Sequence, residues 1–290
     1  MQSPPTVSVV IPVLDDAEQL AACLASLAAQ TRQPDEVVVV DNGSTDGSAE
    51  VALAAGATVL HEPRRGIGAA AGHGYDAARG AVIARVDSDS ELPPDWLARA
   101  TRWFDDPLVT AVTGPGRFRG LGPIAGLFWD VAYMRAYFFL MTGALARPPL
   151  FGSNMLMRRS AWLAVRHRVH RDDAMVHDDV DLSIQFDPTW RTVLDTGLVA
   201  SVSGAPVRDA SGLVVRTEKA LRTMWRSGMR AFSPARIMRR VLIGTRPVPV
   251  VRRVEHADRI DRADRTDRAD RTDRADPTDR PAPAPAPVPQ

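Results

Sequence analysis

Two acidic motifs are the parts of this sequence best suited to chemistry. Asp87-Ser88-Asp89 directly follows a mostly apolar run, and His177-Asp178-Asp179-Val180-Asp181 forms a second cluster further along the chain. Two carboxylates that flank one small residue can share a hard divalent cation and the diphosphate that this cation neutralises. By residue type alone, the first motif could equally be a turn and the second the acidic start of a helix.

The residues before and between these motifs predict the elements that would position them. Val7–Val13, Glu36–Val40 and Ala81–Val86 are short apolar runs, as expected for parallel strands that are buried on both faces. Helical spacing predicts helices over Ala17–Gln30 and Ala69–Arg79. This alternation predicts an α/β fold with a Rossmann-like, mostly parallel sheet flanked by helices.

Loops that follow parallel strands open at one edge of the sheet, so residues in different loops should meet there. The expected set is Asp15, Asp41, Arg65, Asp87 and Asp89. A ligand bound at this edge would therefore meet several carboxylates and one arginine.

The segment VSVVIPVLDDAEQLAACLASLAAQTRQPDEVVVVDNGSTDGS resembles the opening of the family 2 glycosyltransferases, which have a GT-A fold. RGIGAAAGHGYDAARGAVIARVDSDSELPPDWL resembles the part of that family that carries its DXD motif, and the resemblance continues more loosely to near residue 205. It implies an enzyme that moves a sugar from a UDP- or GDP-linked donor to an acceptor, with inversion and with Mn²⁺ or Mg²⁺.

The resemblance also implies roles for individual residues. Asp89 would bind the metal, and Asp87 would contact the ribose or share the metal. Asp179 would be the base that takes the acceptor's proton, as a single displacement requires, and Asp178 would orient the acceptor or the base. The residues implied on the nucleotide-sugar side are Pro12, Asp41, Arg65, Gly66, Asp87 and Ser88, and those on the acceptor side are Gly152, Ser153 and Asn154.

Some of these assignments keep an alternative. Asp41 could contact the nucleobase or only shape the turn DNGSTDG, and Arg65 could reach the nucleotide or remain a solvated surface residue. The helix after Gly66 departs from the family pattern, because Ala70–Gly74 lacks the arginine and asparagine that many members have there. The sequence therefore leaves the nucleotide open.

Two other functions compete with sugar transfer. A nucleotidyltransferase could use the same two-acid metal site, although the glycine-rich, lysine-bearing phosphate loop expected there is missing. A non-catalytic scaffold with a GT-A-like fold is the other alternative, and the presence of Asp87, Asp89 and Asp179 speaks against it.

Three later segments carry further expectations. The glycine-rich Gly114–Gly122 predicts a flexible loop, and Arg191–Val202 predicts a hairpin or a pair of short strands. Leu121–Ala146 is apolar and aromatic, but Asp130 and Arg135 interrupt it. Because charged residues are costly inside a bilayer, we expect a long helix that is part core and part acceptor-facing, with membrane contact on one face left open.

The C-terminal part differs in composition from the rest. Thr217–Leu242 predicts a basic amphipathic helix that could lie on an anionic membrane, cover a substrate phosphate, or pack with solvated arginines. A lipid-linked acceptor is therefore one open alternative. Nucleic acid is not an expected partner, because the arginines belong to no recognised module.

The whole chain has 290 residues and a net charge of +1. Its one cysteine excludes an internal disulfide and agrees with a reducing compartment. The N-terminus shows no secretory signal, so we expect a cytoplasmic protein that could be peripheral at the inner face of the membrane. The predicted divisions are a GT-A domain over 1–205 with a nucleotide-binding half (1–115) and an acceptor half (116–205), a basic helical extension over 206–245, and a disordered Asp-Arg and Pro-Ala tail over 246–290.

Overall fold

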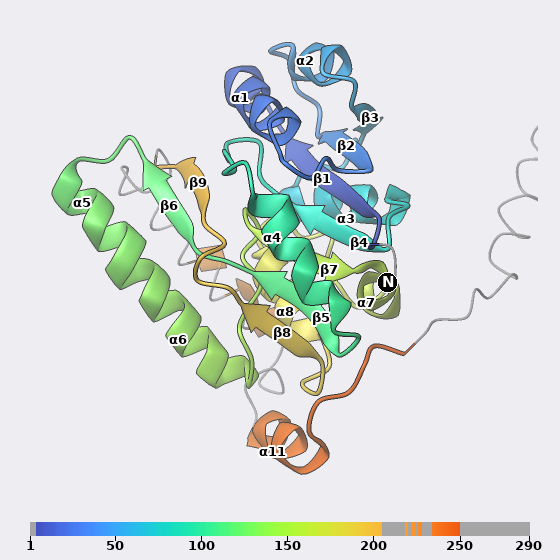
Figure 1. The fold of residues 1–290 in the computed structure, drawn as a ribbon, viewed down its shortest axis with the longest axis vertical. Helices are drawn as coiled ribbons and strands as arrows, with labels where there is room; N and C mark the ends of the chain where they lie inside the picture. The colour runs from blue at the N-terminus through green and yellow to red at the C-terminus, as the bar shows by residue number, and fades with distance from the viewer. Residues whose placement is uncertain (1–3, 205–217, 220–221, 224, 228–233, 250–290) are drawn as a thin grey trace, which may run out of the picture. The chain divides into compact units, whose positions relative to one another are not determined.

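The computed structural model describes residues 4–204, 218–219, 222–223, 225–227 and 234–249 (Figure 1). A seven-stranded sheet with the order β3-β2-β1-β4-β7-β5-β8 forms the centre of the domain, and β6 and β9 form a separate two-stranded sheet. The strands are β1 (Val7–Val13), β2 (Glu36–Asp41), β3 (Thr58–His61), β4 (Val82–Arg85), β5 (Val109–Thr113), β6 (Gly116–Arg119), β7 (Met155–Arg158), β8 (Arg191–Leu194) and β9 (Ala200–Ser203).

The large sheet is mostly parallel, as the sequence predicts. β1 pairs in parallel with β2 and with β4, and β5 pairs in parallel with β8. β7 is the exception, because it lies antiparallel between β4 and β5. All seven residues of β1 are buried, which fits a central strand covered on both faces. The predicted fold class is therefore confirmed.

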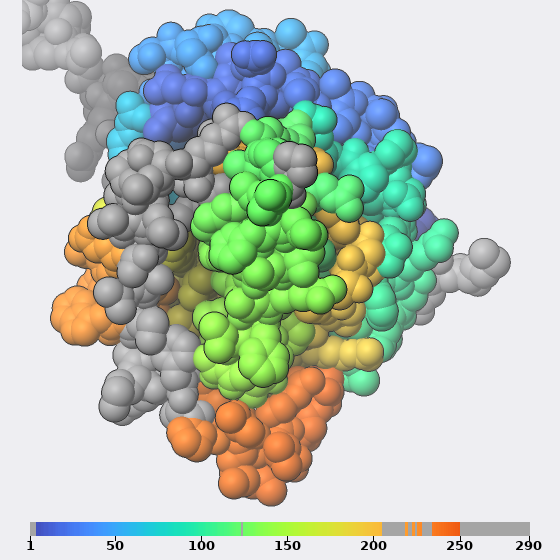
Figure 2. Space-filling view, turned by 90° about the vertical axis from the view of Figure 1, so that its left-hand side faces the viewer, coloured from blue at the N-terminus to red at the C-terminus, as the bar shows by residue number. Residues whose placement is uncertain are grey.

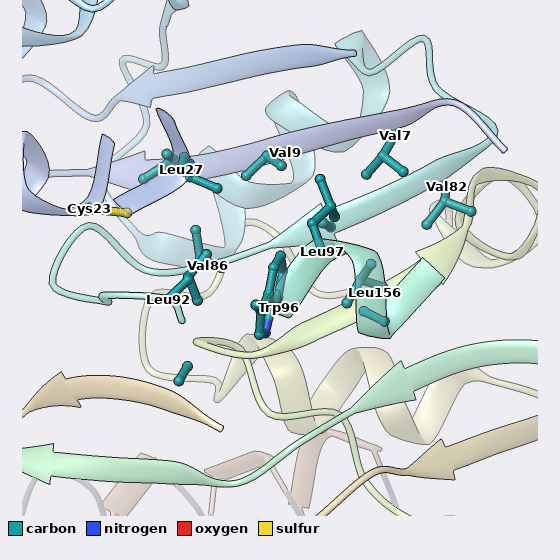
Figure 3. Packing of buried hydrophobic residues seen from close by; sticks show 14 of the residues in the cluster. Val7, Val9, Cys23, Leu27, Val82, Val86, Leu92, Trp96, Leu97 and Leu156 are labelled. Carbon is teal, nitrogen blue, oxygen red and sulfur yellow. The ribbon is translucent and has the colours of Figure 1, made fainter. Parts of the chain in front are cut away.

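Helices cover both faces of this sheet. The α-helices whose bounds the structure describes are α1 (Ala17–Ala28), α2 (Ser48–Ala54), α3 (Ile67–Ala77), α4 (Trp96–Arg102), α5 (Pro123–Leu127), α6 (Met134–Leu145), α7 (Arg159–Val165), α8 (Asp178–Gln185) and α11 (Pro234–Ile243). Alternate residues of β1 point to opposite faces. Val9 packs with α1 and α4, where Cys23, Leu27 and Trp96 are buried (Figure 3). Val10 packs on the other face with residues of α3, α7 and α8.

In the second half, one expectation needs correction, one is met by one of its two alternatives, and one strand was not predicted. Gly114–Gly122 is more than a flexible loop, because it contains β6, which pairs in parallel with β9. Arg191–Val202 does contain two short strands, but β8 and β9 belong to different sheets and form no hairpin. The residues before α7 form β7, a buried strand of the central sheet. Each of these pairings joins segments that are distant in the sequence, so local spacing could not reveal them.

The apolar segment Leu121–Ala146 forms a long helix, as predicted. α5 continues through a π-helical turn (Phe128–Tyr133) into α6. Within the part of the chain that the structure describes, Ile124–Leu145 is the one helix long and apolar enough to cross a membrane by length and composition. Of the predicted extension over 206–245, α11 and a few residues before it are described, and the predicted tail lies outside the described residues from residue 250 onward.

Candidate active site

A cleft of about 450 Å³ opens at the carboxyl ends of β1 and β4. This is the edge where ligands of open α/β sheets bind. Seven of the residues singled out from the sequence line it: Pro12, Arg65, Gly66, Asp87, Ser88, Asp89 and Ser153. The lining also includes Asp16, Asn42 and Tyr133, which the sequence did not assign to a site. The loops after β1, β2 and β4 converge as predicted, but of the expected set only Arg65, Asp87 and Asp89 line the cleft, and Asp15 and Asp41 do not.

A larger hollow, of about 1060 Å³, lies at the other end of the sheet. It is lined by residues near the starts of β1 and β2, such as Thr6 and Glu36, and by aliphatic residues of α1. It contains neither of the two acidic motifs. We therefore assign the chemistry to the smaller cleft.

A buried arginine joins the two acidic motifs. Arg85, the last residue of β4, is only 2% exposed. Its Nη2 donates to Asp87 Oδ1 at 2.8 Å, and its Nη1 contacts Asp178 Oδ2. Burial alone would lower the pKa of the Arg85 guanidinium, but the carboxylates of Asp178 and Asp87 raise it well above its usual value. Arg85 is thus a fixed positive charge beneath the site.

The loop between α6 and β7 links the same motifs from the other side. The backbone N–H of Gly152 donates to Asp179 Oδ2 at 3.0 Å, and Ser153 Oγ donates to Asp87 Oδ2 at 2.6 Å. A Cβ on Gly152 would lie 2.8 Å from Nη1 of Arg85. Only glycine therefore lets this backbone pass over the guanidinium without displacing it.

Both predicted catalytic acids lie in the first turn of α8, where the helix dipole favours negative charge. Burial raises the pKa of the Asp178 carboxyl, with Arg85 opposing this rise and Asp179 adding to it. Asp181, in the same turn, is fully buried and accepts hydrogen bonds from the backbone N–H of His170 at 2.7 Å and from its ring at 2.9 Å. It holds the loop before α8 and does not line the cleft.

The cleft is lined by three carboxylates, those of Asp16, Asp87 and Asp89. Burial, together with the carboxylates of Asp87 and Asp16, raises the pKa of Asp89 to about 7. Asp16 itself accepts a hydrogen bond from Ser88 Oγ at 2.7 Å. Among the described residues, no group of three or more His, Cys, Asp or Glu side chains could hold a metal ion. A cation bound here by one or two carboxylates would need its other ligands from water or phosphate, as is usual for Mg²⁺.

Six of the residues singled out from the sequence are not among those that line the cleft: Asp15, Asp41, Gly152, Asn154, Asp178 and Asp179. Asp41 accepts a hydrogen bond from the backbone N–H of Ser44 at 2.9 Å and lies 3.4 Å from the ring of His61. Asn154 is fully buried and contacts Trp96 Nε1 at 2.8 Å and the carbonyl of Leu198 at 2.6 Å. Asp41 thus shapes its turn, and Asn154 braces the base of the loop that carries Gly152 and Ser153.

Asn42, the neighbour of Asp41, does line the cleft. Its side chain donates to the carbonyls of Glu62 and Arg64 and accepts from the backbone N–H of Gly66 at 2.8 Å. Gly66 has a φ of 139°, and a Cβ there would lie 3.1 Å from Ala174. Asn42 therefore fixes the loop that presents Arg65, which is exposed.

The sequence analysis missed the role of Arg85, and one signal could have revealed it. A charged residue in an otherwise apolar strand must find a partner when that strand is buried. The spacing from Asp178 could not have been foreseen, because the two residues are 93 positions apart. Tyr133 had no signal of its own within an aromatic segment.

Comparisons with known proteins identify the family and the fold. The family model described as Glycosyl transferase family 2 matches residues 8–162. An uncharacterised glycosyltransferase of Mycobacterium tuberculosis is 39% identical over 123 residues, which are 42% of this chain and 52% of that protein. The chain thus spans about half the length of the curated relatives it matches.

Solved structures share the fold at low identity. A mannosyltransferase from Pyrobaculum calidifontis, in complex with GDP-Man and Mn²⁺, superposes with a TM-score of 0.55 at 24% identity, covering 76% of this chain and 65% of that chain. Glucosyl-3-phosphoglycerate synthase from M. tuberculosis, in complex with Mn²⁺, UDP and phosphoglyceric acid, gives a TM-score of 0.56 at 21% identity, with 77% and 79% covered.

Proposed function

The chain belongs to glycosyl transferase family 2, and we propose that it is an inverting glycosyltransferase that moves a sugar from a nucleotide sugar to an acceptor. The observation that carries this proposal is the link through Arg85, which holds Asp87 and Asp178 on one guanidinium at the carboxyl edge of the sheet. This link supports the assignment of both acidic motifs to one site, although Asp178 and Asp179 are not among the residues that line the cleft.

We propose a UDP- or GDP-linked donor that lies in the cleft. Pro12, Arg65, Gly66 and Ser88 line this space, and Asn42 holds the loop of Arg65 in place. Two proteins with the same fold bind such nucleotides together with Mn²⁺. Asp41 would act on the nucleobase only indirectly, through the turn that it shapes.

Asp89 and Asp87 would hold a divalent cation, Mn²⁺ or Mg²⁺. When bound, the cation neutralises the charge of the departing diphosphate. Besides burial, repulsion from the carboxylates of Asp87 and Asp16 raises the pKa of Asp89, and this repulsion supports a cation at this place. Asp87 is already oriented for this task by Arg85 and Ser153.

Asp179 would be the general base. Its Oδ2 accepts a hydrogen bond from the backbone N–H of Gly152. This bond fixes the carboxylate beside the loop where we propose that the sugar acceptor binds. It would take the proton of the acceptor hydroxyl while that oxygen forms a bond to the anomeric carbon and the bond to the diphosphate breaks. Positioned proton transfer of this kind contributes roughly 10²–10⁴-fold to a rate. Asp178 is a positioning residue in this scheme, because it is bound to Arg85.

The proposal also includes the domain boundaries, the location in the cell and the side on which the acceptor binds. We propose that residues 1–205 form the catalytic domain, that 206–245 are an extension and 246–290 a tail, and that the protein acts in the cytoplasm. The acceptor would be bound beside Gly152 and Ser153. A nucleotidyltransferase is the competing function, and no observation in the cleft favours it.

The test is metal-dependent release of nucleotide from UDP- and GDP-sugars. We expect UDP or GDP release with Mn²⁺ that EDTA abolishes, together with a Mn²⁺-dependent thermal shift on binding the free nucleotide. Asp89→Ala should lose both, whereas Asp105→Ala, an exposed acid outside the cleft, should keep them. Nucleotide binding that Asp89→Ala leaves unchanged would contradict the proposal, and release of pyrophosphate from a nucleoside triphosphate and a sugar phosphate would favour the competing function.

A further inference from the structure

The helix α11 is amphipathic, but it turns its charged side toward the protein. Arg236 donates to the carbonyls of Ile184 and Phe186, both at 3.0 Å, and Arg240 donates to the carbonyls of Pro188 and Trp190. Arg239 pairs with Asp187 at 3.0 Å. These arginines lie three and four positions apart and so share one face of the helix.

The opposite face of α11 is apolar and exposed. Its residues are Ile237, Met238, Val241 and Leu242, and Leu242 is 75% exposed. An amphipathic helix on a water-soluble surface normally buries this side and exposes the charged one. Here the arrangement is reversed, so the apolar side is available to something other than the catalytic domain.

A second apolar surface lies along the helix from α5 to α6. Its outward-facing large residues are Ile124, Leu127, Phe128, Phe139 and Leu140, and Phe139 is 79% exposed. The charged residues in Ile124–Leu145 are Asp130 and Arg135. Asp130 Oδ1 accepts a hydrogen bond from the backbone N–H of Phe118 at 2.7 Å. Only 11% of the most apolar window of this helix is buried.

The two apolar surfaces are neighbours. α11 lies beyond the C-terminal end of α6 in Figure 1, and Figure 2 shows α11 directly below the green surface of α5 and α6. The other side of the long helix is bound to the domain, because Met134, Phe138 and Leu145 are buried and Tyr137 donates to the carbonyl of Leu150. This attachment fits a helix that lies on an apolar phase and does not cross it.

We propose that these two surfaces, the outward faces of α5–α6 and of α11, dock the protein on an anionic lipid bilayer. The charge of the surrounding sequence fits this occupant, because residues 206–245 contain nine Lys or Arg and two Asp or Glu. Arg222, Arg226 and Arg239 pair with carboxylates of the domain, whereas Arg236 and Arg240 bond neutral backbone carbonyls, so the segment keeps a positive charge. Basic residues beside an inserted apolar face are what anionic lipid surfaces attract. Tyr133, from the same long helix, lines the cleft, so the docked surface borders the proposed active site.

Vesicle flotation of the full chain tests this proposal. We expect the protein to float with phosphatidylcholine vesicles that contain phosphatidylglycerol, and much less with phosphatidylcholine alone. Phe139→Asp and Leu242→Asp should each lower the bound fraction about tenfold or more, because each removes the burial of one large apolar side chain. Leu53→Asp, on α2 at the far end of the domain (Figure 1), is the matched control at a 62% exposed apolar residue and should bind as the wild type does.

Other occupants give different results. If a second copy of the chain covers these faces, sedimentation without lipid should give a dimer that Phe139→Asp converts to a monomer, with no flotation. If residues of the chain outside the structure cover them, the wild type should neither float nor self-associate. Either result overturns the proposal. Nucleotide binding in solution, measured on the same variants, reports on the active site independently.

Discussion

The guanidinium of Arg85 contacts the carboxylate of Asp178, which joins the last residue of β4 to the first residue of α8. The same guanidinium donates to Asp87. The acid that precedes the proposed base and the first acid of the DXD motif are therefore oriented by one buried cation. A change at Arg85 should affect both sides of the site together.

Removing this cation should destabilise the protein. Arg85→Met leaves two carboxylates near a buried site without their partner, which typically costs about 3–5 kcal/mol of the free energy of unfolding. Urea unfolding followed by tryptophan fluorescence measures it. Arg85→Met combined with Asp178→Asn should recover part of the loss, because it removes one unpaired charge. Arg79→Met, an exposed arginine at the end of α3, is the control, and an equal unfolding free energy for Arg85→Met and wild type would refute the role of Arg85.

Asp179→Asn should separate binding from chemistry. The amide oxygen can still accept the hydrogen bond from Gly152, so Mn²⁺-dependent nucleotide binding should persist. The rate of sugar transfer should fall by about 10²–10⁴-fold, because the group that takes the acceptor's proton is lost. Asp172→Asn, at an exposed acid of the preceding loop, should keep full activity. Retention of the wild-type rate in Asp179→Asn would exclude this residue as the base.

Gly152→Ala tests the close approach of the loop to Arg85. The added Cβ would lie 2.8 Å from Nη1, and Arg85 is too deeply buried to move aside. Overpacking of this kind costs about 1–3 kcal/mol, and we expect a loss of that size in thermal or urea unfolding. In Gly143→Ala nothing lies within 4 Å of the new Cβ, so the stability should stay equal or rise slightly through the better helix propensity of alanine.

Asp195 should make stability depend on pH at the acidic end. Hydrogen bonds from Arg99 lower its pKa from 3.8 to about 2, with burial opposing them and Trp103 adding to them. Because the folded pKa is below the unfolded one, the contribution is complete above about pH 4 and is lost as the pH falls through about 2. It should amount to about 1–2 kcal/mol, since water screens Arg99, which is 45% exposed.

Acid titration of Asp195→Asn checks this prediction. The difference in unfolding free energy between wild type and variant should be largest near neutral pH and should shrink below pH 4. A difference that is constant from pH 6 to pH 2 would show that ionisation of Asp195 does not stabilise the fold.

The nucleotide-binding half was predictable because its signals are local. A buried parallel strand such as β1 is recognisable by a run of apolar residues, and Asp87 and Asp89 follow β4 directly. The acids of α8 were also visible, as the first turn of a helix. These patterns need no knowledge of what lies across the sheet.

The rest depends on partners that are distant in the sequence. β7 enters the sheet antiparallel between β4 and β5, and this insertion places Asn154 in the core, outside the lining of the cleft. The amphipathic pattern of α11 was visible, but a pattern defines two faces without saying which one meets the protein. The charged face of α11 meets the protein because backbone carbonyls between residues 184 and 190 accept hydrogen bonds from its arginines.

The central claim is that one cleft holds a metal-bound nucleotide between the DXD motif and Asp179. Crystals grown with Mn²⁺ and UDP or GDP, and measured at the manganese absorption edge, test it most directly. The account predicts one strong anomalous peak in the cleft, bonded to the Asp89 carboxylate and to the diphosphate, on the side of the site that faces Asp179. A nucleotide bound elsewhere, or a manganese peak that does not touch Asp89 or Asp87, would contradict it.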